Sequence, residues 1–189
     1  MRIVIAILAI VGMMAGIVGL FAYLFYRKRA KLRAFVDKHG LEVTGMGPGE
    51  YPEVTGRFRD VSVLIDLIST GGETTTTRMV ASFEEPLPKG LLITARDGGE
   101  PGAIQTGISE VDDLLHIEGK EPEAIVALFQ TEAFFGVVRN FFRQNASGFI
   151  REDGVGAVEG DGLLTDHQIL EKMLQETVDT AKCIQKVLS

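Results

Sequence analysis

The chain of 189 residues has a single cysteine, Cys183, and only three histidines. One cysteine excludes a disulfide within the chain, and its distance from the N-terminus excludes a lipoprotein anchor. The histidines, His39, His116 and His167, are scattered, and none lies within a metal-ligand spacing. We therefore expect no metal, no cofactor and no catalytic residue of this kind, and we interpret Cys183 as a packing residue.

Charge is absent from the 24 residues between Ile3 and Tyr26. As a helix this stretch is about 36 Å long, enough to cross an apolar layer of about 30 Å with some tilt. A cleaved signal has an apolar run of only about 7–15 residues, and this run ends in aromatic residues before a basic cluster. The sequence predicts a transmembrane anchor with a basic juxtamembrane helix over residues 1–40 and a soluble domain over residues 41–189.

Basic residues are concentrated directly after the uncharged run, at Arg27, Lys28, Arg29, Lys31 and Arg33. Because positive loops stay on the cytoplasmic side, we expect a single-pass protein of the inner membrane with its C-terminal domain in the cytoplasm. We also expect these five side chains to contact anionic lipid. From Ala34 onward, 13 Lys plus Arg stand against 26 Asp plus Glu, a formal charge of −13. Such a surface repels phosphate backbones, which argues against nucleic acid as a partner.

Small residues recur at helical spacing inside the uncharged run. Gly12 and Gly16 form a G-x-x-x-G motif, and Gly19 follows Ala15 by the same step. Small side chains let two membrane helices approach closely, so this face predicts a homodimer through the membrane helix. The alternative is that glycine is simply frequent in membrane helices.

The region after the basic cluster first continues as a helix to about His39, with Gly40 as a left-handed C-cap. Alternating and β-branched patterns then predict a strand region. The first two long strands form a hairpin across Arg59-Asp60. The glycines of 45–49 form a loop rather than a nucleotide fingerprint, because no helix follows them. The expected strands cover residues 41–43, 54–58, 61–68, 73–83, 91–95 and 114–118.

The period changes to that of a helix after Pro122, which suits a first helical position. A second helical stretch follows Thr131, and a hairpin then turns around Asp153-Gly154. Thr165 and Gln168 predict a capping box that starts the last helix. Together these elements predict an α+β fold, in which an N-terminal transmembrane helix precedes an antiparallel sheet with helices packed on one face.

The order of motifs resembles that of uncharacterised bacterial membrane-anchored families of unknown function. The resemblance rests on Thr106-Gly107, on Val111-Asp112, and on the strand 114–118 before a Phe-rich helical stretch, a hairpin and a terminal helix. Val111 replaces an aromatic residue that is usual in such families, and Ile108 an acidic one. The resemblance implies no activity and no functional residues.

Two classes of function remain open. The leading hypothesis is a non-enzymatic, membrane-tethered interaction or scaffold domain that contacts membrane lipids and another protein. The alternative is a small hydrolase or ligand-binding module, for which carboxylates would have to converge with a base, a nucleophile or a metal. The candidate acids for that alternative are Asp112, Asp113, Asp161 and Asp166.

Overall fold

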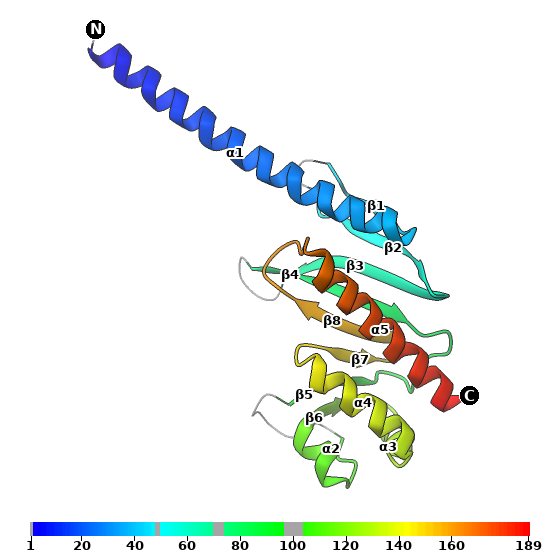
Figure 1. Ribbon diagram of the computed structural model, residues 1–189. Helices are drawn as coiled ribbons and strands as arrows, with labels where there is room; N and C mark the ends of the chain where they lie inside the picture. The colour runs from blue at the N-terminus through cyan, green and yellow to red at the C-terminus, as the bar shows by residue number, and fades with distance from the viewer. Residues whose placement is uncertain (1, 48–49, 70–73, 97–103) are drawn as a thin grey trace.

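A computed structural model describes residues 2–47, 50–69, 74–96 and 104–189, with the side chains of the first helix described from residue 12 onward. The fold is α+β, with an eight-stranded antiparallel sheet in the order β1-β2-β3-β4-β8-β7-β5-β6 (Figure 1). The elements in chain order are α1 (Arg2–His39), β1 (Glu42–Thr44), β2 (Glu53–Phe58), β3 (Val61–Ser69), β4 (Thr75–Ser82), β5 (Leu92–Ala95), α2 (Ser109–Leu114), β6 (Leu115–Glu118), α3 (Pro122–Phe129), α4 (Glu132–Gln144), β7 (Phe149–Arg151), β8 (Gly154–Glu159) and α5 (His167–Leu188).

The predicted hairpin between β2 and β3 is confirmed. Phe58 pairs with Val61, so only Arg59 and Asp60 form the turn. Both have positive φ angles, 49° and 68°. This is the left-handed geometry that two-residue hairpin turns require, because it matches the twist of the strands.

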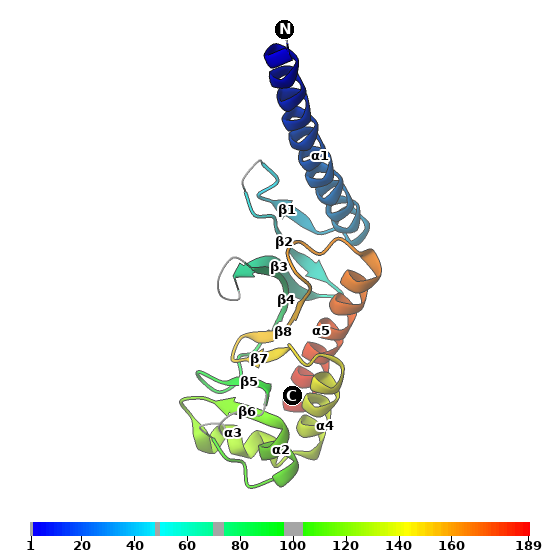
Figure 2. The same ribbon diagram turned by 90° about the vertical axis from the view of Figure 1, so that its left-hand side faces the viewer.

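Helices α4 and α5 lie on one face of the sheet (Figure 2). Helix α5 packs over β3, β4 and β8, and α4 lies beside α5. The strand residues that point toward these helices are buried: Val63, Ile65, Thr77, Met79, Ala81, Ile93, Ile117, Ile150, Val155 and Ala157. They form one core with the buried residues of the helices.

Helix α1 is a continuous helix of 38 residues that ends at His39, as predicted. Its last turns belong to the core, because Leu32, Phe35 and Val36 are at most 1% exposed. Gly40 then adopts a φ of +64°. The backbone N–H of Leu41 donates to the carbonyl of Val36, and that of Gly40 to the carbonyl of Asp37. These two bonds form the glycine C-cap that stops the helix and turns the chain into β1.

The expected membrane span reaches partly beyond the described side chains, because residues 3–11 belong to it. Among the parts of the chain that the structure describes, no single helix is long and apolar enough to qualify as a membrane span. Helices α3 and α4 pass the same criterion only as a pair bent by 87°. Both helices of that pair bury residues in the core, among them Ile125, Phe129, Phe134 and Val138.

Three local expectations need correction. Helix α2 was not predicted. It has only six residues, and a stretch of that length is too short to show a helical repeat of apolar residues. The N-cap of α5 is Asp166, whose carboxylate accepts from the backbone N–H groups of Gln168 and Ile169, so the capping box at Thr165 is wrong by one residue. Gly154 pairs with Arg151 and begins β8, which leaves Glu152 and Asp153 as the turn.

Candidate functional site

The described part of α1 before the basic cluster is apolar and exposed. This segment, Gly12–Tyr26, projects away from the sheet (Figure 1). A Cβ added at Gly12, Gly16 or Gly19 would meet nothing within 4 Å. Its exposed large side chains are Met13, Met14, Ile17, Val18, Leu20, Phe21, Tyr23, Leu24, Phe25 and Tyr26. A contiguous apolar surface of this kind marks a contact with lipid or with protein.

The five basic residues after this segment are not equivalent. Arg27, Lys28, Lys31 and Arg33 are exposed. Arg29 is only 4% exposed, and its guanidinium carbon lies 4.0 Å from the centroid of the Phe25 ring. Its Nη2 donates to the carbonyl oxygen of Glu50 over 2.7 Å. The sequence could not distinguish Arg29 from its neighbours, because the residues around it include Glu50, Leu67 and Leu163, which are distant from it in the chain.

A cavity of about 310 Å³ lies where the segment between β1 and β2 meets α1. Arg29 and Lys28 come to it from α1, and Tyr51 from the β1–β2 segment. Leu67 of β3 and Leu163, which precedes α5, supply apolar wall. The Nε and Nη1 atoms of Arg29 are buried and have no hydrogen-bond partner among the described residues.

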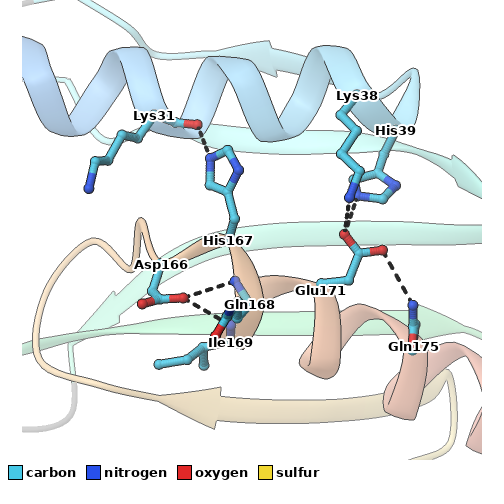
Figure 3. A network of polar contacts seen from close by, with 9 residues as sticks. All are labelled: Lys31, Lys38, His39, Asp166, His167, Gln168, Ile169, Glu171 and Gln175. Carbon is cyan, nitrogen blue, oxygen red and sulfur yellow. Dashed lines mark hydrogen bonds and ion pairs between the residues drawn. The ribbon is translucent and has the colours of Figure 1, made fainter.

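The contact between α1 and α5 contains a polar network (Figure 3). The Oε2 atom of Glu171 lies 2.7 Å from Nζ of Lys38 and 2.9 Å from Nε2 of His39. The Lys38 ammonium group, by its hydrogen bond, and to a smaller degree His39 lower the pKa of Glu171 from its ordinary value. The His39 ring also packs on the rings of Phe35 and Phe58. The His39 side chain therefore combines aromatic packing with a polar contact to Glu171.

A second histidine joins the same contact. Nε2 of His167 lies 2.8 Å from the carbonyl oxygen of Lys31, and its ring packs against Phe35 (Figure 3). His39 and His167 are thus brought to one seam, although they are distant in the sequence. No sequence signal links them, because their proximity depends on how α5 crosses the end of α1. Both histidines have contacts that hold α1 on α5.

The candidate acids do not meet at one place. Asp112 lies in α2, whereas Asp161 and Asp166 precede α5 at another part of the sheet (Figure 1). Asp166 caps α5, and Asp113 and Asp161 are exposed. Within the described ranges, no group of three or more His, Cys, Asp or Glu residues could hold a metal ion.

Asp112 organises the loop that carries the Thr-Gly motif. Its Oδ1 accepts from the backbone N–H and the hydroxyl of Thr106, both over 2.8 Å. Its Oδ2 accepts from the backbone N–H of Gly107 over 3.0 Å. Thr106 is 5% exposed, and Val111 beside Asp112 is fully buried. The Thr-Gly and Val-Asp pairs therefore form one closed loop, and this use of the carboxylate is structural.

The sheet face opposite these helices carries both polar and apolar side chains. Asp66 and Arg78 pair across β3 and β4, with 2.9 Å between Arg78 Nε and Asp66 Oδ1, and this pairing raises the pKa of Arg78. Phe149 lies over Gly156, where a Cβ would collide with its ring. One continuous row of paired residues on this face is Thr55, Leu64, Val80, Gly156, Phe149, Thr94 and His116.

The remaining single residues have ordinary environments. His116, on the open sheet face, lies 3.0 Å from a carboxylate oxygen of Glu118. Cys183 is exposed, so its interpretation as a packing residue is wrong. The buried stripe of α5 passes through Ala181 and Ile184 instead, and residue 183 falls to the side of it.

Comparison of the chain with protein-family models, with curated proteins and with solved structures finds no match. The resemblance in motif order to membrane-anchored families therefore stays a prediction. The case for a function rests on the surfaces, cavities and contacts described above.

Proposed function

We propose that this protein is a membrane-tethered interaction domain, held at the membrane by α1 and acting by binding rather than by catalysis. One observation carries the proposal. Helix α1 continues without a break from the exposed apolar segment Gly12–Tyr26 into the core at Leu32, Phe35 and Val36. An anchor of this kind holds the domain in a fixed orientation, whereas a flexible linker would let it swivel.

Further contacts support a rigid junction. The Schellman-type cap at Gly40, the ion pairs of Glu171 and the contact of His167 with Lys31 all hold the end of α1 on the domain. Breaking the junction would expose the buried side chains of α1, which costs free energy in proportion to the apolar area. The domain and the projecting apolar segment therefore move as one unit.

The chemistry of the described carboxylates supports binding over catalysis. Asp112 and Asp166 are occupied by backbone N–H groups of their own loops. A general acid or base has to reach a substrate proton, and an acid that already closes a loop is poorly placed for that task. Among the residues that the structure describes, no specific contact favours the hydrolase alternative.

Membrane association tests the proposal. The full chain is expressed in bacteria, and the membrane fraction is washed with alkaline carbonate. We expect the protein to resist the wash and to be released by neutral detergent. Met14→Arg places a charge in the middle of the uncharged run, which disfavours insertion by about 3 kcal/mol. It should move most of the protein into the wash.

Ala34→Arg is the matched control, because Ala34 is exposed on the same helix beyond the basic cluster. It should leave the distribution unchanged. Release of the unaltered chain by carbonate, to the same extent as Met14→Arg, would contradict the membrane tether.

A further inference from the structure

Arg29 has an incomplete set of partners for a buried charge. The guanidinium group offers five N–H donors in a planar fork. Only Nη2 has a hydrogen-bond partner among the described residues, the carbonyl oxygen of Glu50. The ring of Phe25 covers one side of the group, which stabilises a cation but satisfies none of its N–H donors. A buried charge with unmatched donors is costly unless an anion completes it.

The surroundings of Arg29 suit an oxyanion. The cavity of about 310 Å³ has Lys28 as a second cation, and the exposed Tyr51 also lines it. Glu50 also lines the cavity, but its Oε2 accepts from the backbone N–H of Gly47 over 2.7 Å. That carboxylate is directed to its own loop, and among the described residues no ion pair joins Lys28 or Arg29 to a carboxylate. Arginine recognises phosphate through paired N–H donors, and lysine adds a point charge.

A second hollow follows α1 directly beside this cavity. Phe25 and Lys28 belong to the walls of both. The second hollow, of about 880 Å³, continues along the exposed apolar segment past Phe21 to Val18. A molecule with a phosphate group and an adjoining acyl chain would place the first at Arg29 and the second along α1.

We propose that the cavity at Arg29 binds a phosphate group, and that this group is the headgroup phosphate of an anionic phospholipid. The choice of a lipid rests on the proposed membrane tether, whereas the phosphate site itself does not. Free phosphate is the other source of the same chemistry. The bound group completes the donors of Arg29 and locks the β1–β2 segment against α1.

Titration calorimetry on the full chain in neutral detergent tests the site without requiring a bilayer. The probes are dihexanoyl phosphatidic acid, inorganic phosphate and dihexanoyl glycerol, which has the acyl chains without the phosphate. We expect dihexanoyl phosphatidic acid to bind saturably, at one molecule per chain. We expect no binding of dihexanoyl glycerol. Arg29→Gln should weaken this binding about tenfold, because charge-assisted hydrogen bonds are lost.

Arg143→Gln is the matched control, since it removes the same charge from an exposed position on α4, outside the basic cluster and the lining of the cavity. It should change the affinity by less than about twofold, because exposed charges are screened. If Arg29→Gln fails to fold by circular dichroism, Arg29→Lys keeps the charge, loses the fork and should show a smaller but measurable loss. Lys28→Gln, an exposed change, should also weaken binding.

The outcomes separate the sources and the proposals. Phosphatidic acid binding at least about tenfold tighter than phosphate assigns the site to lipid, and equal affinities assign it to free phosphate. Equal losses in Arg29→Gln and Arg143→Gln, or binding of dihexanoyl glycerol as tight as that of phosphatidic acid, would overturn the phosphate site. Absence of saturable binding would do the same. The carbonate wash tests the membrane tether separately. Failure of the phosphate site therefore does not imply failure of the tether, and failure of the tether does not imply failure of the phosphate site.

Discussion

At the scale of single residues, similar side chains have different tasks according to what packs on them. Arg29 and Arg33 lie one turn apart on α1, yet the first is buried and the second exposed. Asp112 and Asp113 are neighbours, yet the first closes a loop and the second faces solvent. The value of a charge to this protein therefore depends on its contacts and not on its position in a charged cluster.

Asp112 offers a direct test of this difference. Asp112→Ala leaves three donors of Thr106 and Gly107 without their acceptor, and two of these belong to a residue that is only 5% exposed. We expect the free energy of unfolding to fall by about 1–3 kcal/mol. Urea unfolding of the full chain in neutral detergent, followed by circular dichroism, measures it.

Asp113→Ala serves as the control and should change stability by no more than about 0.5 kcal/mol. Asp112→Asn keeps an acceptor oxygen and should lie between the two. Equal stability of Asp112→Ala and Asp113→Ala would show that the carboxylate does not hold this loop.

At the scale of elements, the contact between α1 and α5 determines how the projecting helix is held. It combines buried apolar side chains of both helices with the ion pairs of Glu171 (Figure 3). Apolar burial supplies most of the stability, because partly exposed ion pairs contribute little. The polar groups add a fixed register, since Lys38 and His39 both meet the same carboxylate.

Glu171 makes this contact sensitive to acid. Its pKa is lowered in the folded protein, chiefly by the hydrogen bond from Lys38, so the folded state binds its proton less readily than the unfolded chain. The stabilisation is present above the ordinary value of 4.5 and is lost as the pH falls through the lower folded pKa. Glu171→Gln should cost about 0.5–1 kcal/mol at pH 7, a modest figure because the pair is partly exposed.

Urea unfolding of the unaltered protein and of Glu171→Gln between pH 7 and pH 3 measures this effect. The difference in stability between them should shrink below pH 4.5. Glu42→Gln, a change of an exposed carboxylate on β1, should follow the unaltered protein at every pH. A difference that stays constant down to pH 3 would assign the loss to packing and not to charge.

At the scale of the whole molecule, charge is divided between two regions. The basic cluster lies at the end of the apolar segment of α1, and the chain from Ala34 onward carries a formal charge of −13. An acidic domain is repelled by an anionic membrane surface, whereas the basic cluster is attracted to it. The proposed anchor would therefore hold most of the sheet away from the lipid surface, with the base of α1 and the adjoining cavity at Arg29 nearest to it.

Orientation is the prediction that belongs to this scale. Because basic residues favour the cytoplasmic side, we expect the domain to lie in the cytoplasm. Green fluorescent protein fused after Ser189 should fluoresce, and alkaline phosphatase fused at the same position should be inactive. The opposite pair of results would place the domain on the other side. Replacing all five basic residues by glutamine should reduce the bias and serves as the control.

The sequence by itself determined the local elements of this protein. Alternation was enough to predict strands at the positions of β3 and β4. Glycine and turn residues were enough for the end of α1 at His39 and for the β2–β3 hairpin. These features depend on residues close in the chain, whose geometry follows from side-chain period and backbone preference.

Only the tertiary structure decided which distant elements meet. The β7–β8 hairpin inserts between β4 and β5, and α5 crosses the end of α1, so that Glu171 reaches Lys38 and His39. Arg29 is buried and donates a hydrogen bond to the carbonyl oxygen of Glu50, which lies 21 residues further along the chain. The sequence did not determine these contacts, because pairing between remote segments depends on the total apolar area that an arrangement of the whole chain buries. The local pattern of residues does not contain that information.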